Sequence, residues 1–383
     1  MPAFCARSTA SGTALRAGVL ALALAASAAS AGQLDNHVLG QTHTAEDVDK
    51  VAPAVSSDGK FFVVPVPVVN PTIGYGVAPT ALYTFSADPL NPSTPRSTIA
   101  AVAGYTSSQS WFGGGGFKLY LDDDRYRLSA QAGYGSLNVK FYGFGGGDLL
   151  RTNPIDLELS GPVAQAVAQA RVLPGFYLGL KLRWADPTAT VELPVDFLPS
   201  LSLRTQLLGL GPVFEYDTRD STWYPGDGAY STLDVIRYDK AGLADARFWM
   251  IDGSYARYHT LVENLILAGQ LRAAYAGEGA PFFMLPYISL RGLPAGLFLA
   301  PDVVQGQAEL RWEVGKGFGL VGFGGGGAAF GSYGDESGAS YAAAGGVGLR
   351  YRISDTDRMN IGFDVAVGTD AGVSVYFSIG EAF

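Results

Sequence analysis

The sequence predicts an all-β protein, a transmembrane antiparallel β-barrel of about 16 strands. Only 16% of its 383 residues are charged, 48% are hydrophobic, and 51 are glycine. Soluble domains average about 25% charged residues, so this composition favours a barrel that shows apolar side chains to lipid. Repeated segments of about ten residues, in which apolar and polar side chains alternate between turns, make the same prediction.

Residues 1–31 are expected to be a secretory signal peptide. Arg7 and Arg16 form its positive region, an apolar core follows over residues 17–26, and Ala29-Ser30-Ala31 offers a small-x-small cleavage site. The apolar run is shorter than the ~20 residues that a transmembrane helix needs. We therefore expect export, through a cleaved leader, to the outer membrane of a Gram-negative bacterium.

Charge and cysteine content exclude several kinds of site. The full chain carries a formal charge of −9, and the leader holds two arginines and no acids, so the mature chain would carry −11. An acidic balance without a basic cluster argues against nucleic acid as a partner. The single cysteine, Cys5, lies in the leader, so the mature chain has no thiolate metal ligand. No cofactor is expected.

The mature chain divides into a short polar segment and the barrel. We expect residues 32–64 to be a polar periplasmic tail and residues 65–383 to form the outer-membrane barrel. Each unpaired peptide group in hydrocarbon costs several kcal/mol, so the sheet must close. Closure is expected to bring Ile73–Phe85 next to Val373–Phe383. The predicted strands begin near Ile73, Ser97, Ser110, Arg125, Leu137, Gly161, Gly175, Leu203, Ala229, Arg247, Val262, Val303, Gly317, Ala339, Met359 and Gly372.

The connections differ in length in the way that membrane barrels require. Tight turns are expected at Ser108-Gln109, Ser136, Leu173-Pro174, Thr260-Leu261 and Gly315-Lys316, and we place the tight turns on the periplasmic side. Long outer loops are expected at residues 86–96, 146–160, 187–202 and 277–302. The connection from Thr218 to Gly228 is the exception, because it is long and periplasmic.

Several motifs, in their order, resemble the BamA/TamA superfamily, also called the bacterial surface antigen family. Leu290-Arg291-Gly292-Leu293 is similar to its Arg-Gly-aromatic loop motif, although Leu293 stands where the family has an aromatic residue. A second signature, Asp-x-Arg-Asp followed by Pro-x-x-Gly, is matched by Asp217, Arg219, Asp220, Pro225 and Gly228. The terminal Phe383 resembles the family's C-terminal assembly signal.

The resemblance implies that the loop at residues 277–302 folds back into the barrel lumen and that Arg291 pairs with Glu309 on the next strand. Glu309 shares a polar, lumen-facing parity with Gln305, Gln307 and Arg311. The family also has an Asp on the following strand, where this chain has only glycine and Phe323, and Asp364 is expected to substitute. The alternative is an exposed Arg291 without a fixed partner. Arg125, Arg127, Arg350 and Arg352 also have lumen-facing parity, which predicts mixed-sign pairing in a narrow, plugged pore.

Two functions are compatible with these features. The resemblance implies a role in outer-membrane biogenesis, with insertion or translocation of an outer-membrane protein or lipid through a weak seam between the first and last strands. The family's periplasmic POTRA domains have no room in the tail. The alternative is a passive porin-like channel. No P-loop, HExxH or GxSxG motif is present, so no enzyme is expected. The expected partners are outer-membrane lipid, lipopolysaccharide and the assembly machinery that inserts this chain as a client.

Overall fold

The structure, a computed structural model, describes residues 59–87, 94, 97–143, 148–191, 201–221, 224–239, 245–333, 336–354 and 358–383. The expected signal peptide and most of the expected tail, residues 1–58, lie outside this set. Within it, no helix is long and apolar enough to cross a membrane.

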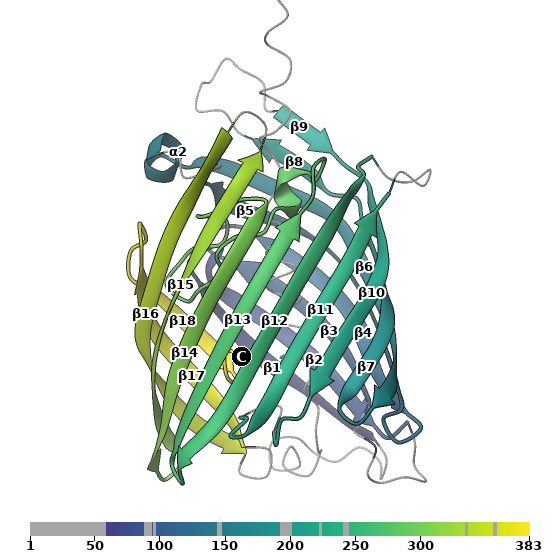
Figure 1. Ribbon diagram of the computed structural model, residues 1–383, viewed down its shortest axis with the longest axis vertical. Coiled ribbons are helices and arrows are strands. Elements are labelled where there is room, and N and C mark those ends of the chain that lie inside the picture. The colour runs from purple at the N-terminus through teal and green to yellow at the C-terminus, as the bar shows by residue number, and fades with distance from the viewer. Residues whose placement is uncertain are drawn as a thin grey trace, which may run out of the picture.

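The described strands form one 18-stranded antiparallel sheet, in which β8 and β9 only extend the end of β6. The other sixteen strands form the wall of a nearly closed barrel (Figure 1), which confirms the predicted fold class and strand number. The wall strands are β1 (Gly59–Asn70), β2 (Gly74–Phe85), β3 (Ser97–Thr106), β4 (Trp111–Leu121), β5 (Tyr126–Phe141), β6 (Ile155–Leu173), β7 (Phe176–Ala185), β10 (Leu207–Asp217), β11 (Gly228–Tyr238), β12 (Phe248–Val262), β13 (Leu265–Ala276), β14 (Asp302–Gly315), β15 (Phe318–Tyr333), β16 (Glu336–Ser354), β17 (Met359–Gly368) and β18 (Ser374–Ile379).

The agreement in strand number hides two errors that cancel. No turn occurs at Ser136, and Tyr126–Phe141 is one continuous strand. Its glycines resemble turn signals but serve close packing, since a β-carbon on Gly135 would lie 2.8 Å from the Trp111 carbonyl oxygen. Conversely, β1 begins at Gly59, inside the segment assigned to the tail. The expected closure is therefore wrong, because β2 pairs with β1, and β1 lies between β2 and β18.

The predicted alternation along the strands holds in the wall. On β14, Val304, Leu310 and Trp312 are exposed on the outer face, whereas Glu309 and Arg311 between them are buried in the lumen. Side chains of alternate residues point to opposite faces of a strand, so an apolar exterior surrounds a polar interior. That distribution suits a barrel with lipid outside.

The two ends of the barrel differ. One end, which we call the turn end, carries the short connections at residues 174–175, 263–264 and 316–317. The other, the loop end, carries β8 (Thr188–Val191), β9 (Leu201–Arg204), the short helix α2 (Asp148–Thr152) and the 277–301 connection (Figure 1). Because β1 adds one strand at the start, the connection at residues 86–96 joins its strands at the turn end, and its assignment as an outer loop is wrong.

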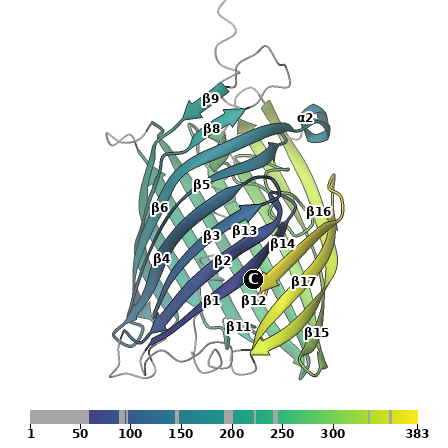
Figure 2. The same ribbon diagram turned by 180° about the vertical axis from the view of Figure 1, so that it is seen from behind.

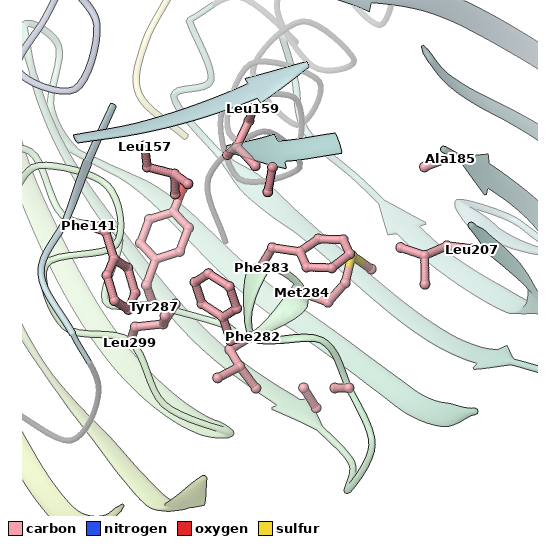
Figure 3. Packing of buried hydrophobic residues seen from close by; sticks show 14 of the residues in the cluster. Phe141, Leu157, Leu159, Ala185, Leu207, Phe282, Phe283, Met284, Tyr287 and Leu299 are labelled. Atoms are coloured by element: carbon pink, nitrogen blue, oxygen red, sulfur yellow. The ribbon is translucent and has the colours of Figure 1, made fainter. Parts of the chain in front are cut away.

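The connection 277–301 turns inward and closes the lumen near the loop end with an apolar cluster (Figure 3). Its 3-10 turn, Phe282–Met284, is buried, and the Phe282 ring meets the Phe141 ring edge-on at 5.1 Å between centroids. Leu157, Leu207 and other buried side chains of the wall complete the cluster. Apolar side chains that fill a lumen exclude water from it, so this end is a plug.

This packing generates a first prediction. Phe283→Ala removes a ring that is 2% exposed, and large-to-small changes of this kind cost about 3–5 kcal/mol. We expect the variant to lose its heat-modifiable, folded band in detergent gels at a clearly lower temperature than the unaltered protein. Phe117→Ala, on the outer face of β4, is the matched control and should shift the midpoint little. Equal shifts would place Phe283 outside the plug.

Candidate functional site

Below the apolar plug, the connection 277–301 carries Arg291 into the lumen. A tight turn at Gly292 makes this possible, with φ +110° and an amide that donates to the Tyr376 hydroxyl at 2.8 Å. A β-carbon on Gly292 would lie 2.7 Å from the Val367 carbonyl oxygen, so both conformation and space require glycine there. Leu290 and Leu293 on either side are buried among wall residues. The open alternative, an exposed Arg291, does not match this geometry.

The Arg291 guanidinium lies between two carboxylates. One nitrogen donates to Asp364 Oδ2 at 2.6 Å, and another donates to Glu309 Oε1. The guanidinium also stacks on the Phe323 ring, 3.6 Å from its centroid. The structure thus brings together both partners expected from the sequence, and it adds an aromatic face that was not foreseen. Charge-assisted bonds of this kind are about twice as strong as neutral ones.

Two further arginines extend this contact into a closed cluster. Arg311 Nε donates to Glu309 Oε2 at 2.9 Å, and Arg350 Nη1 donates to Asp364 Oδ1 at 2.5 Å. Arg350 Nε also donates to Glu381 Oε2 at 2.8 Å. We call Arg291, Arg311, Arg350, Glu309, Asp364 and Glu381 the lumen ion cluster; its side chains comprise three cations and three anions. The Arg291 side chain is 12% exposed, and the other side chains of the cluster are almost fully buried.

The C-terminal residues belong to this cluster and not to the wall. β18 ends at Ile379, and Glu381 is 3% exposed and also accepts a bond from the Asn360 amide at 3.0 Å. Arg311 Nη2 donates to the backbone oxygen of Phe383 at 2.9 Å. The Phe383 ring packs against Tyr258 and Ala268 on the lumen face. The expectation that the whole of Val373–Phe383 lies along the wall is therefore wrong.

The second signature builds the turn that supports the cluster from below. Asp217 accepts two bonds from Arg219, at 2.9 and 2.8 Å, and Asp220 accepts the backbone amide of Gly226 at 2.8 Å. The turn brings the Pro225 carbonyl within 3.5 Å of Arg311 Nη1. Gly228 closes the turn at φ +105°. These residues therefore shape a support for Arg311.

Sequence reasoning missed the roles of Arg350 and Glu381 in this cluster. The lumen parity of Arg350 was visible, but its partner Glu381 follows a break in the strand pattern. The glycine at position 348 is a second sign of the cluster, because a β-carbon there would overlap the Asp364 carboxylate. Arg127 also points inward and pairs with Glu215 at 2.5 Å. Arg125 does not point inward; it lies in an exposed turn beside Asp122.

The second feature of the site is the seam where the wall meets itself. β1 and β18 lie side by side (Figure 2), yet no residue-by-residue pairing joins them within the described residues. β18 is six residues long and β1 is twelve. β18 has half the length of β1, and the tail after Ile379 enters the lumen, so β18 is too short to cover the whole edge of β1.

Two prolines weaken the same edge of β1. On β2, Tyr75 directs its backbone groups to Ser107 on the β3 side. In an antiparallel pair, the backbone N–H and C=O groups of two opposite residues either both point between the strands or both point away. Val69 lies opposite Tyr75, so its backbone groups point away from β2. Pro67 and Pro65 are two and four residues before Val69, so their backbone groups point to the same side, towards β18. Proline has no N–H, so this edge lacks two successive hydrogen-bond donors.

Comparison with known proteins identifies the fold. A scan against family models found no match, and neither did a search of curated protein sequences. Among solved structures, BamA from Haemophilus ducreyi lacking POTRA domains 1-3 is similar with TM-score 0.58 and 12% identity, covering 85% of this chain and 70% of that chain. CdiB from Acinetobacter baumannii is similar with TM-score 0.54 and 13% identity, over 85% and 60%. CdiB from Escherichia coli gives 0.51 and 10%, over 87% and 68%.

These likenesses confirm, at the level of the fold, the resemblance that the motifs predict. The chain has the barrel fold of BamA and CdiB. It spans less than two thirds of the Acinetobacter CdiB chain. At 10–13% identity the likeness concerns the fold and not a specific activity.

Charge balance in the lumen ion cluster generates a second prediction. Arg291→Ala leaves two cationic side chains in the cluster against three anionic ones. Glu309→Ala leaves three cationic side chains against two anionic ones. Removing one partner of a buried pair costs about 3–5 kcal/mol. The double variant restores the balance, so its loss of heat resistance should be smaller than the sum of the single losses. Arg125→Ala, which breaks only an exposed pair, is the control. Additive losses would show that Arg291 and Glu309 do not interact.

Glycine at the cluster generates a third prediction. Gly348→Ala places a methyl group where the Asp364 carboxylate lies, so Asp364 must move away from Arg350. We expect a marked fall in the unfolding temperature. Gly322→Ala, on the outer face of β15, meets no atom within 4 Å and should be tolerated. If both variants unfold alike, the close packing around Asp364 is not required.

Proposed function

We propose that the protein acts in outer-membrane biogenesis, inserting or translocating a protein or lipid through the seam between β1 and β18. The observation that carries this proposal is the incomplete seam, where β18 is short and the facing edge of β1 lacks two donors. An unpaired strand edge is a template that can bind another extended chain, and a local gap also lets lipid approach the lumen. Localisation in the outer membrane of a Gram-negative bacterium, reached by a cleaved leader, is part of this proposal.

The contents of the lumen support the same proposal over a passive channel. The apolar plug and the lumen ion cluster occupy two successive levels of the interior. Steady conduction would require a continuous water path, which buried apolar side chains and mutually paired charges do not provide. The plug also leaves the loop end covered, so the seam is the more direct route between lumen and membrane.

The partners follow from this mechanism. Outer-membrane phospholipid and lipopolysaccharide would contact the apolar wall, and the protein would itself enter the membrane as a client of the outer-membrane assembly machinery. Its substrate would be an outer-membrane protein strand or a lipid. A strand substrate would pair with the free backbone groups of β1, whereas a lipid would pass the gap without such pairing.

Restoring the missing donors tests the proposal. The double change Pro65→Val and Pro67→Val gives β1 two new N–H groups on the edge that faces β18. Each new hydrogen bond should contribute about 1 kcal/mol, so the seam should close more tightly. We expect a more heat-resistant barrel that fails to restore outer-membrane integrity and protein content in a deletion strain.

Pro79→Val is the matched control, because the nitrogen of Pro79 faces β3 inside the continuous wall. That variant should retain function. Full activity of the doubly substituted protein would contradict the proposed route, and large, steady conductance steps in planar bilayers would favour the channel instead.

A further inference from the structure

A groove of about 480 Å³ lies across β12, β13, β14 and β15. Its lining includes Tyr255, Arg257, Gly269, Leu271, Ala308 and Gly324. These six and Gly306 have the outward parity of their strands, whereas the two remaining lining residues, Gln270 and Gln307, have the inward parity. Seven of the nine lining positions therefore face the lipid side of the wall. It lies outside the seam and the lumen ion cluster.

Packing within the wall does not require two of the three glycines that line this groove, whereas a β-carbon on the third, Gly306, would lie 3.0 Å from Leu271 Cδ2. A β-carbon on Gly269 would come no closer than 3.9 Å to any atom, and one on Gly324 no closer than 3.7 Å. These are ordinary contact distances. By contrast, a β-carbon on Gly114 elsewhere in the wall would lie 2.7 Å from the Ala132 carbonyl oxygen, so glycine is needed there. Strand packing therefore leaves open space over Gly269 and Gly324.

An uncompensated charge stands at one end of the groove. Arg257 is exposed on the outer face, between Ala256 and Tyr258, whose side chains are buried in the lumen. No ion pair or hydrogen bond involves the Arg257 side chain among the residues that the structure describes, whereas the lumen arginines described above are paired. An arginine on the lipid face costs up to about 2–4 kcal/mol at the membrane centre and about 0–1 near its surface.

The groove runs from this charge into the membrane. Arg257 lies opposite Gly269, Gly269 opposite Ala308, and Ala308 opposite Gly324, so the row crosses the strands at right angles. Three strand spacings span about 14 Å. Arg257 is five residues before Val262, where β12 reaches the turn end. The strands lean, so the row climbs from β12 towards β15, away from the turn end (Figure 1).

We propose that this groove binds one anionic phospholipid. The phosphate would accept hydrogen bonds from the Arg257 guanidinium near the membrane surface, and one acyl chain would lie over Gly269, Ala308 and Gly324. A single negative charge matches the single unpaired cation, and bonds between a guanidinium and a phosphate are strong and directional. The elongated apolar lining matches a hydrocarbon chain that no water contacts.

Native mass spectrometry of the full, folded protein tests the site. The probe is phosphatidylglycerol, with phosphatidylethanolamine of the same chains as the zwitterionic comparison of zero net charge. We expect the unaltered protein to retain one phosphatidylglycerol, and Arg257→Gln to bind it about tenfold more weakly, while Arg257→Lys keeps most of the binding. Gly324→Leu should fill the groove and weaken binding of both lipids.

Gly322→Leu is the matched control, because Gly322 lies on the same face of β15 with no atom within 4 Å of its β-carbon and does not line the groove. It should bind phosphatidylglycerol normally. Each variant must first show the heat-modifiable folded band. Equal retention by the unaltered protein, Arg257→Gln and Gly324→Leu would overturn the proposal, as would equal weakening by Gly322→Leu. Equal binding of the two lipids by the unaltered protein would overturn the preference for an anionic head group.

Discussion

Buried charge is the constraint on which the lower lumen depends. Arg311 and Glu309 are essentially inaccessible, and an isolated ion in such a place costs far more than the barrel could tolerate. Each charge must therefore meet an opposite one, and the partners come from five separate parts of the chain. Arg291 comes from the inward connection, Glu309 and Arg311 from β14, Arg350 and Asp364 from β16 and β17, and Glu381 from the tail.

The same constraint reaches the seam. Arg350 and Arg311 hold Glu381 and the backbone oxygen of Phe383 inside the lumen, so the chain leaves the wall after Ile379. β18 is consequently too short to cover β1, whose facing edge is already poor in donors at Pro65 and Pro67. The lumen ion cluster and the incomplete seam are thus two consequences of one arrangement. Pairing of the tail with the arginines and pairing of the tail with β1 are mutually exclusive.

Period-two alternation and composition were sufficient for the fold class, since they reflect lipid outside and polar side chains inside. The contacts of Arg291 with Glu309 and Asp364 were predicted from the resemblance of the loop motif to a known family, and strand parity agreed because it places those carboxylates in the lumen. Local pattern failed where tertiary context decides. Gly135 looks like a turn residue but permits close strand packing, and the prolines of β1 look unlike a strand but are acceptable at an edge. The inward path of Glu381 could not be predicted, because it depends on Arg350, 31 residues earlier.

The lumen ion cluster holds the C-terminal residues inside the barrel. Disulfide trapping measures this most directly, in a mature chain that is expected to have no cysteine of its own. Phe383→Cys paired with Ala268→Cys should cross-link readily, because Phe383 packs against Ala268, and adding Glu381→Ala should reduce the cross-link. A cross-link that instead forms between Phe383→Cys and Val63→Cys on the outer face of β1 would contradict the account, because the tail would then continue along the wall and close the seam.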